Sequence, residues 1–477
     1  MVFDLLIVLI LYAISVAASV HILLHKQNPR AALGWMAVSL GLPGFGAFFY
    51  WLLGRNRIRT RARAWQRRGE GIHLPEGVEP PEEVPAILRA PFKTQNYVLI
   101  RQLADAVTRR PLVDGNRIEI LLNGEQAYPA MLQAIQKAEQ FLDLSSYIFD
   151  TRACGRRFAT ALIEAAERGV KVRVLVDALG EMYTLPRIRT LFKGTKVQFS
   201  LFLPFSLSQR GLHINLRNHR KLLIVDGKVG FTGGMNISTR HNVSNPGKRS
   251  PVADIHFKFF GPVVGHMQAS FMEDWHFATG ESMNARTYPE PVSGGESLCR
   301  GVSAGPNENF EKLVWIVTGA LTCARNRVCI MTPYFVPDQT MISALCGAAL
   351  RGVKVEIILP EKNNLPFVAG ASRANFAELL RYGIEIMYQS GHFVHSKLLL
   401  MDEHYALVGS ANIDARSQRL NFEFNVEIYD KETNQNLRAY FAQACVDARK
   451  VSMEDIEQQS MICKLSDRFL RLFSPFL

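Results

Sequence analysis

The stretch "HRKLLIVDGKVGFTGGMN" spans residues 219–236, and a closely similar stretch, "HSKLLLMDEHYALVGSAN", spans residues 395–412. Each contains His-x-Lys-x4-Asp, and each then carries Gly and Asn at the same offsets. One copy of so short a pattern is a weak signal, because it arises by chance. Two copies in the same register indicate that one structural unit has been duplicated.

The amino-acid sequence around the motifs supports this duplication. From about residue 110 strand-like and helix-like patterns alternate, at 117–122, 128–140, 141–149, 155–169 and 170–178. The segment "ALIEAAERGVKVRVLV" of the first half matches "ALCGAALRGVKVEIIL", which ends at Leu359 in the second. Such alternation is typical of α/β folds with largely buried strands. We therefore predict two tandem domains, 111–285 and 286–477, each a mixed β-sheet flanked by helices.

Two apolar segments precede these domains. Residues 5–24 contain no acidic or basic side chain except His21, and their length suffices to cross about 30 Å of hydrocarbon. Residues 31–53 are uncharged and end in aromatic side chains suited to a membrane interface. Glycines and a proline near its middle predict that this second segment is bent or re-entrant. A cleaved signal peptide is the alternative for the first segment, although the start "MVFD" lacks the expected basic residues.

The positive charge of the chain is concentrated after these segments. The formal net charge is +12, and the run from Arg55 to Arg68 contains seven arginines. A basic run beside apolar segments favours an anionic membrane surface, with nucleic acid or a solvated tail as alternatives. We assign residues 1–68 to a membrane hairpin with a basic juxtamembrane segment, and 69–110 to a linker. The bias of positive charge predicts that the remaining chain is cytoplasmic. The seven scattered cysteines, which form no C-x-x-C pair, predict reduced thiols, in agreement.

The motif residues predict a reaction at phosphorus. In an extended strand residues i and i+2 share a face, so His219 and Lys221 point the same way, as do His395 and Lys397. The Lys side chains, with the amides of Asn236 and Asn412, are suited to hold the non-bridging oxygens of a phosphodiester.

One histidine then attacks phosphorus, giving a phosphohistidine, while the other protonates the leaving alkoxide and later deprotonates the incoming hydroxyl. The sequence shows no carboxylate cluster at the motifs to hold a metal ion, so the lysines take the place of a metal clamp. We therefore predict neither a metal nor another cofactor.

The duplicated motif, followed by Gly-Gly/Ser-x-Asn, resembles the phospholipase D superfamily. The segments "YFVPD", "RGVKV", "HSKLLLMDEHYALVGSANIDARSQRLNFE" and "RLFSPFL" are similar to the bacterial cardiolipin synthases of that superfamily, and the resemblance spans essentially the whole chain. It implies that an acidic residue further along the chain holds each catalytic histidine, and the matching positions are Asp254 and Glu423. It also implies that His219 is the nucleophile and His395 the acid and base. Asp226 and Asp402 complete the catalytic motif, although their place beyond the buried strand favours a structural role.

The resemblance further implies an activity. One phosphatidylglycerol donates its phosphatidyl group to a second, giving cardiolipin and glycerol, in a multi-pass protein of the bacterial inner membrane. A phospholipase D-type hydrolase is the alternative; a nuclease and a non-enzymatic lipid scaffold are further ones. The membrane segments and juxtamembrane arginines favour lipid over nucleic acid as the partner. Transfer rather than hydrolysis rests on the resemblance alone, and a homo-oligomer is left open.

Four further positions and the C-terminus have two interpretations each. Arg416 and Arg419 are candidates for binding a second phosphate or for ordinary ion pairs. His213 and His392 either line the cleft or are unrelated to it. The C-terminal run of Phe469, Leu472 and Phe473 with basic residues predicts an amphipathic helix that lies on a membrane or docks on the core.

Overall fold

The computed structural model describes residues 2–26, 29–54, 95–204, 216–247, 250–281, 294–305 and 311–474. The chain divides into two compact units, Met1–Gly71 and Ile72–Leu477. The basic run of residues 55–68 and the linker before residue 95 lie outside the described residues, as does His213.

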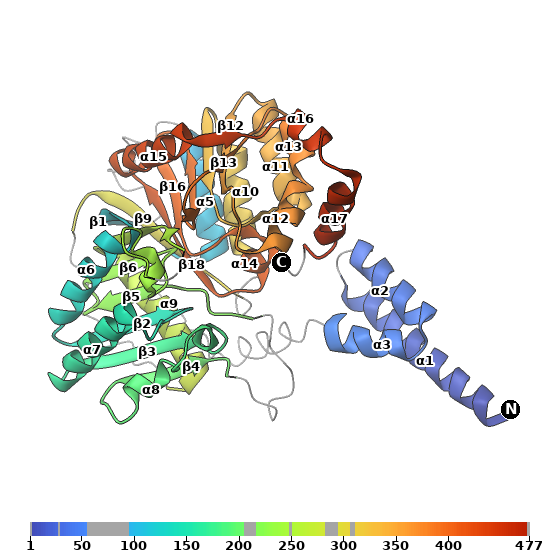
Figure 1. Cartoon of the computed structure of the whole chain (residues 1–477), viewed down its shortest axis with the longest axis horizontal. Coiled ribbons are helices and arrows are strands. Elements are labelled where there is room, and N and C mark those ends of the chain that lie inside the picture. The colour runs from blue at the N-terminus through green and yellow to red at the C-terminus, as the bar shows by residue number, and fades with distance from the viewer. Residues whose placement is uncertain are drawn as a thin grey trace. The chain divides into compact units, whose positions relative to one another are not determined.

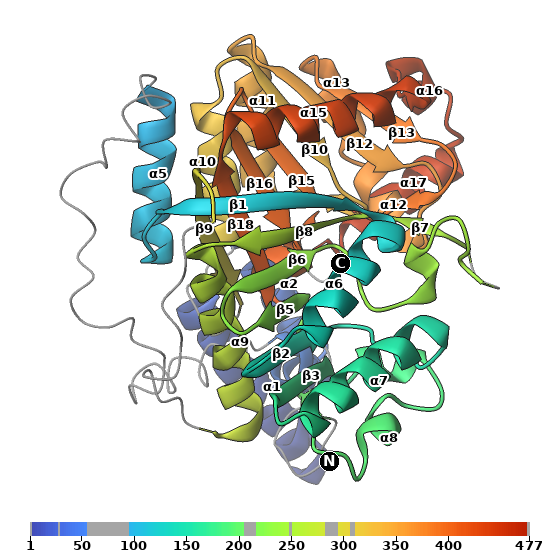
Figure 2. The ribbon, with the colours of Figure 1, turned by 90° about the vertical axis from the view of Figure 1, so that its left-hand side faces the viewer.

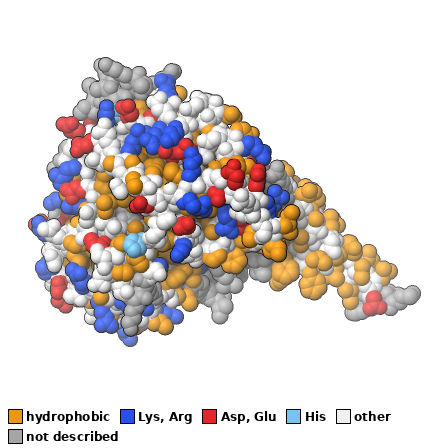
Figure 3. Space-filling view, turned by 45° about the horizontal axis from the view of Figure 1, so that its top comes forward, with side chains coloured by type: hydrophobic (Ala, Val, Ile, Leu, Met, Phe, Trp, Pro, Cys, Tyr) orange, Lys and Arg blue, Asp and Glu red, His pale blue; other side chains and the backbone are white. Residues whose placement is uncertain are grey.

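The first unit is helical, with α1 (Val2–His25), α2 (Pro29–Gly41), α3 (Phe45–Phe49) and a π-helical turn, η1 (Tyr50–Gly54). Within the described residues, one helical stretch, Asp4–His25, has the length and the mean hydropathy, 2.5, to cross a membrane. Figure 3 shows hydrophobic side chains over most of the visible surface of these helices. The first predicted membrane segment is therefore a continuous apolar helix.

The second predicted segment is bent. Helix α2 ends at Gly41, and Gly44 takes a φ of 79° in the turn that follows, which favours glycine. A Cβ at Gly46 would lie 2.0 Å from the carbonyl oxygen of Val38, so only glycine allows α3 to approach α2 this closely. At 13 residues α2 is about 20 Å long, too short to cross a bilayer alone.

The second unit is built on one 15-stranded mixed sheet (Figure 1). Its first half contributes β1 (Val113–Leu122), β2 (Phe141–Ser146), β3 (Lys171–Asp177), β4 (Gln198–Phe202), β5 (Leu222–Val225), β6 (Val229–Gly233) and β8 (Ile255–Phe260). The second half contributes β9 (Ser297–Ala304), β10 (Arg327–Met331), β12 (Lys354–Pro360), β13 (Glu385–Gln389), β15 (Leu398–Met401), β16 (Tyr405–Gly409), β18 (Glu423–Tyr429) and β19 (Ala448–Lys450). Four two-residue strands pair outside this sheet: β11 (Phe335–Val336) with β17 (Ile413–Asp414), and β14 (Phe393–Val394) with β7 (Val252–Ala253).

The two halves have the same strand order. Outward from the centre, the first half runs β1-β8-β6-β5-β2-β3-β4, and the second runs β9-β18-β16-β15-β10-β12-β13, with β19 added at the edge. The halves join where β1 pairs antiparallel with β9, through Val113 opposite Cys299 and Asn116 opposite Ser297. The duplication read from the sequence is thus a duplication of topology, and the predicted α/β fold is confirmed.

Helices cover both faces of this sheet (Figure 2). In the first half α6 (Asn123–Gln136) and α7 (Ala153–Glu167) bury one face, and α9 (Val263–Thr279) buries the other. In the second half α10 (Lys312–Cys323) and α11 (Gln339–Leu350) occupy the first of these positions, and α15 (Lys431–Val446) the second. The remaining helical elements are α5 (Gln95–Thr108), η4 (Gly180–Tyr183), α8 (Arg189–Phe192), η5 (Thr239–His241), α12 (Pro366–Arg373), α13 (Phe376–Arg381), α14 (Ala415–Arg419), α16 (Met453–Glu457) and α17 (Met461–Arg471).

One predicted boundary is wrong. The linker was predicted to extend to residue 110, but α5 packs into the core of the second half through Tyr97, Ile100 and Ala104. These residues are three and four positions apart, which places them on one face of a helix. The predicted boundaries at 68/69 and 285/286 lie outside the described residues.

Candidate active site

Both His-x-Lys pairs lie immediately before a buried strand. Lys221 precedes β5 and Lys397 precedes β15, and all four residues of each strand are buried. The apolar runs "LLIV" and "LLLM" fix these strands in the middle of the two half-sheets, because they bury side chains on both faces. The polar pair is thereby held at the strand's start, as the sequence predicts.

Backbone hydrogen bonds tie each histidine to the other half of the chain. The His219 N–H donates to the Phe422 carbonyl at 2.9 Å, and the His395 N–H donates to the Ala253 carbonyl at 2.8 Å. Phe422 and Ala253 directly precede the two predicted acidic residues, Glu423 and Asp254. These two hydrogen bonds are equivalent under the duplication. Each motif therefore contacts the opposite half where β18 or β8 begins.

The side chains follow the same crossed pattern. His219 Nδ1 lies 3.0 and 3.1 Å from the two carboxylate oxygens of Glu423, and His395 Nδ1 lies 2.9 Å from Asp254 Oδ2. The expectation that both acids lie further along the chain is therefore wrong for His395, whose partner Asp254 precedes it. Sequence order could not reveal this, because the pairing is set by contact between the halves.

Each carboxylate has its own support. Ser410 Oγ donates to Glu423 Oε2 at 2.5 Å, and Asn421 Nδ2 donates to Glu423 Oε1 at 3.1 Å. Gly234 occupies the position equivalent to Ser410, and a Cβ there would lie 2.3 Å from Asp254 Oδ1. The Gly-Gly/Ser-x-Asn pattern after each motif thus serves the two acids differently. Gly234 leaves room for Asp254, and Ser410 donates a hydrogen bond to Glu423.

Burial and positive charge set the protonation states. Burial lowers the pKa of His219, and the neighbouring Glu423 opposes that shift. Burial, Lys397, Lys221 and the charge of His219 together hold the pKa of His395 well below its ordinary value. Burial alone raises the pKa of Glu423, but His219, Lys221 and Ser410 outweigh it and leave the pKa lowered. Both imidazoles are therefore neutral and Glu423 is ionised at neutral pH.

The two lysines are buried beside the histidines. Each ammonium group donates to the carbonyl of its own motif's histidine, Lys221 to His219 and Lys397 to His395. Desolvation lowers the pKa of Lys221 to about 7 and that of Lys397 to about 8. An acid of the opposite half opposes each shift, Glu423 that of Lys221 and Asp254 that of Lys397. An anion entering the site would offset this desolvation and restore the charge on both ammonium groups.

The two asparagines differ in their contacts. Asn236 is buried, and its Oδ1 accepts from the Ile148 N–H at 3.1 Å. Asn412 is buried too, and its Nδ2 lies 3.2 Å from Ser417 Oγ. Asn412 and Lys397 line one small cavity of about 30 Å³, so these two predicted phosphate-binding residues lie together.

Asp226 and Asp402 do not reach the histidines. Asp226 follows β5 and accepts from the backbone N–H groups of Glu139, Gln140 and Phe141. Asp402 follows β15 and accepts from the N–H groups of Arg325, Asn326 and Arg327. Both carboxylates lie at the opposite end of a four-residue strand from the His-x-Lys pair. Their inclusion in the catalytic set is therefore corrected: they fix the loop that enters the neighbouring strand.

The middle residue of the first motif joins the halves. Arg220 points away from His219 and Lys221, as alternation requires, and its guanidinium is buried. It donates to Asp274 Oδ1 at 2.9 Å, to Ser303 Oγ at 2.7 Å and to the carbonyl of Glu423 at 3.2 Å. The motif therefore binds the backbone of the acid that holds its own histidine.

Sequence reasoning missed aromatic neighbours of both histidines. The rings of Tyr147 and His219 lie 5.3 Å apart, and those of Tyr334 and His395 lie 6.2 Å apart, both edge to face. Tyr147 in "SSYIFD" and Tyr334 in "TPYFVPD" are equivalent under the duplication, which was the available signal. His241, which carried no recognisable pattern, lies 6.4 Å from His395.

The remaining candidates divide clearly. Arg419 pairs with Asp338 at 2.9 Å, which supports its ordinary ion-pair interpretation. Burial raises the pKa of Tyr147, and the charge of the half-buried Arg416 opposes that rise, so Arg416 lies near the His219 side of the site. His392 is exposed.

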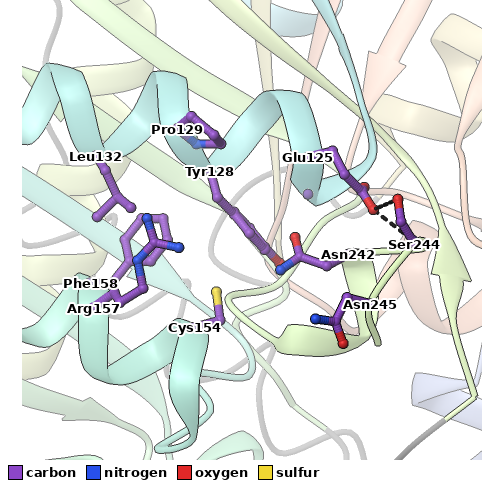
Figure 4. A pocket seen from close by; sticks show the side chains of 11 residues that line it. Glu125, Tyr128, Pro129, Leu132, Cys154, Arg157, Phe158, Asn242, Ser244 and Asn245 are labelled. Carbon is purple, nitrogen blue, oxygen red and sulfur yellow. Dashed lines mark hydrogen bonds between the residues drawn. The ribbon is translucent and has the colours of Figure 1, made fainter. Parts of the chain in front are cut away.

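A cavity of about 270 Å³ lies elsewhere, between α6, α7 and the segment after η5. Figure 4 shows Leu132, Phe158 and Arg157 on one side of it, Asn242 and Asn245 on the other, and Tyr128 between them. Neither His219 nor His395 lines it. Within the described ranges, no three His, Cys, Asp or Glu side chains are grouped so as to hold a metal ion. All seven cysteines are free thiols.

Comparison with known proteins agrees with this geometry. A phosphatidylserine synthase from Haemophilus influenzae has the same fold, with a TM-score of 0.62 at 14% identity, covering 79% of this chain and all of that one. The model of the cardiolipin synthase, phospholipase D-like domain family matches residues 131–275 and 317–445. The model of the phospholipase D-nuclease N-terminal region matches residues 13–55.

Curated relatives extend the match over nearly the whole chain. A cardiolipin synthase of Geobacillus kaustophilus is 31% identical over 95% of this chain and 90% of its own length. Cardiolipin synthase A of Pseudomonas aeruginosa is 32% identical over 96% of this chain and 93% of its own length. The fold and the paired motifs are those of a phospholipase D-like protein. Within that class, the chain belongs to the cardiolipin synthase family.

Proposed function

We propose that this protein joins two phosphatidylglycerol molecules into cardiolipin and glycerol through a phosphohistidine intermediate. The observation that carries the proposal is the crossed pairing of His219 with Glu423 and of His395 with Asp254. Because each histidine is held by the opposite half, the two imidazoles belong to one site. The names of the relatives support the phosphatidyl substrates and the product.

In the first step His219 is the nucleophile. Glu423 accepts the Nδ1–H of the neutral ring, which leaves the Nε2 lone pair free to attack phosphorus. The bond from phosphorus to the headgroup oxygen breaks, and His395 gives its proton to the departing glycerol. Lys221, Lys397, Asn236 and Asn412 hold the non-bridging oxygens, whose charge grows in the transition state.

In the second step the headgroup hydroxyl of another phosphatidylglycerol attacks phosphorus. His395 accepts its proton, the bond from phosphorus to His219 breaks, and both histidines return to their starting states. One phosphodiester replaces another. Asp254 orients His395 for both proton transfers, and the negative phosphate raises the pKa of His395 on binding, so that this ring carries a proton when it acts as an acid.

Phospholipid substrates agree with an apolar α1 and with the match to the N-terminal region of phospholipase D-like proteins. We infer that α1 and the bent second segment anchor the chain in a bacterial inner membrane as a multi-pass hairpin. The arginines after residue 54 then favour a cytoplasmic location for the catalytic unit on an anionic membrane surface.

Product analysis tests the proposal. The purified full chain is incubated with phosphatidylglycerol labelled in its headgroup glycerol, and the products are identified by mass. We expect cardiolipin and free labelled glycerol in equal amounts, and no turnover by His219→Ala or His395→Ala. Phosphatidic acid as the main product would indicate a hydrolase, and turnover of nucleic acid would indicate a nuclease. Absence of any product from the wild type would leave the scaffold. Substantial synthesis by His395→Ala would contradict the two-histidine scheme.

A further inference from the structure

Helix α17 presents three distinct sides. At about 100° per residue, Leu470 and Asp467 fall on one side, the basic residues Lys464, Arg468 and Arg471 on a second, and the apolar residues on a third. The large apolar side chains left exposed in this helix and the turn after it are Met461, Ile462, Leu465, Phe469, Leu472 and Phe473.

The first side docks α17 on the catalytic unit. Arg373 of α12 donates to both carboxylate oxygens of Asp467, at 2.8 and 2.7 Å, and Asp467 is buried. Leu470 packs against the cluster of Val336, Val368 and Ala371. Figures 1 and 2 both show α17 lying against α12. The orientation of the helix is therefore fixed, and its apolar side is held outward: Ile462 is 80% and Phe469 59% exposed.

This helix lies close to the second catalytic histidine. Tyr334 packs on the same small cluster as Leu470, and its ring is the one that meets His395. Tyr334 also donates a hydrogen bond to Asn364 Oδ1 at 2.9 Å. The next residues of the chain, Leu365 and Phe367 at the start of α12, are exposed as well, Phe367 by 66%.

The first half has an equivalent exposed segment. The ring of Tyr183 lies 6.2 Å from that of Tyr147, which contacts His219. Tyr183 is exposed, and Leu185 two residues later is 77% exposed. Each histidine is thus separated from exposed apolar side chains by one tyrosine.

We propose that these side chains form a bilayer-docking surface, here called the docking rim, which seats the entrance of the active site against an anionic membrane. The rim consists of the apolar side of α17, Leu365 and Phe367 at the start of α12, and Tyr183 and Leu185. The basic side of α17 contributes three cations of the kind that anionic headgroups attract. Seated in this way, the entrance receives headgroups directly from the leaflet, so a lipid reaches His219 without leaving the membrane.

The docking itself is independent of the proposed reaction, and only its effect on turnover rests on it. Because α1 anchors the chain in any case, bulk membrane binding is not informative. The full chain is therefore reconstituted in phosphatidylglycerol–phosphatidylcholine vesicles in a Cys463→Ser background. Single cysteines replace Ile462 or Phe469 and are labelled with an environment-sensitive fluorophore, and the unsubstituted background serves as the labelling blank. Leu350→Cys and Val446→Cys are matched controls, because both residues are apolar and 71% exposed but lie at the ends of α11 and α15.

We expect lipid-borne quenchers to reduce emission from the rim positions several-fold and to leave the control positions unchanged. Equal quenching at rim and control positions would overturn the proposal.

Turnover gives a second readout. We expect Leu465→Glu with Phe469→Glu to lower cardiolipin formation from vesicles about tenfold, since the apolar side no longer enters the interface. The same variant should process short-chain phosphatidylglycerol below its micellar concentration like the wild type, and Leu350→Glu should be unchanged on both substrates. Normal synthesis from vesicles by the rim variant would overturn the rim and leave the reaction standing. Rim quenching without cardiolipin from the wild type would overturn the reaction and leave the rim.

Discussion

At the scale of single residues, the site depends on cations held in a buried place. Lys221 and Lys397 have lost most of their water, and Glu423 and Asp254 only partly replace it. Lysines in this state bind an anion strongly when protonated and lose the proton easily when the site is empty. In the proposed reaction the phosphodiester is therefore bound through groups whose charge depends on pH near neutrality.

This dependence predicts how activity changes with pH. A lysine is cationic below its pKa, so raising pH through about 7 and 8 removes charge first from Lys221 and then from Lys397. We expect kcat/KM, which reports the free protein, to fall above about pH 7 and more steeply above about pH 8. The fall in kcat should come at higher pH, because bound phosphate keeps the lysines protonated. Lys397→Arg, whose guanidinium stays charged, should remove the steeper fall above about pH 8 and leave the one that begins near pH 7. A kcat/KM that stays level to pH 10 would contradict the assigned roles.

Much of this site could be predicted from residue patterns. The duplicated motif indicated His219, Lys221, His395 and Lys397, and the resemblance to the phospholipase D superfamily indicated Asp254 and Glu423. The pairing could not be predicted, because the carboxylate that meets His395 is brought by the opposite half and precedes it in the chain. Tyr147, Tyr334 and His241 were missed because a single aromatic or histidine in a strand or loop is usually a core residue.

At the scale of elements, Asp226 and Asp402 show how a spacing that is repeated in both motifs serves folding. Both residues adopt a positive φ, 51° and 49°, in the turn after a buried strand. Each then satisfies several backbone N–H groups of the loop entering the adjacent strand. In each motif four apolar strand residues therefore separate the His-x-Lys pair of the proposed reaction from an Asp that stabilises the fold.

Removing one of these carboxylates should affect stability rather than chemistry. Asp402→Ala leaves the N–H groups of residues 325–327 without their acceptor, and we expect it to lower the free energy of unfolding by about 2–4 kcal/mol. Thermal unfolding measures this, and activity per folded molecule should stay within a few-fold of the wild type. His395→Ala is the matched opposite, with unchanged melting and no turnover. Loss of activity by Asp402→Ala without loss of stability would contradict the structural role.

Elements also show where sequence patterns were insufficient. The apolar positions of α5 follow helical spacing. The Pro- and Glu-rich stretch before α5 nevertheless led to a predicted linker that included this helix. The second membrane segment was predicted to be bent from its glycines and proline, and the turn at Gly44 confirms it. How far that segment crosses a bilayer is set by the helices packed against it and by the thickness of the lipid layer, and a local sequence pattern carries information on neither.

At the scale of the whole molecule, two equivalent half-sheets meet at β1 and β9, and each half completes the other's histidine. Within one chain, therefore, both histidines of a site are present. We expect a mixture of His219→Ala and His395→Ala chains, reconstituted together, to remain inactive. Measuring cardiolipin formation by the mixture checks this, with wild type diluted into either variant as the control for assembly. Recovery of about a quarter or more of wild-type activity would show that sites are shared between chains.

The central claim is that Glu423 serves the nucleophile and Asp254 serves the acid and base, across the two halves. A phosphatidyl donor with a p-nitrophenol leaving group tests it most directly, because that group departs without a proton. With this donor we predict that Asp254→Asn releases a burst of p-nitrophenol and accumulates a phosphatidyl adduct, which peptide mass mapping places on His219. Glu423→Gln should give neither the burst nor the adduct. An adduct on His395, or a burst that survives in Glu423→Gln and is lost in Asp254→Asn, would contradict the account.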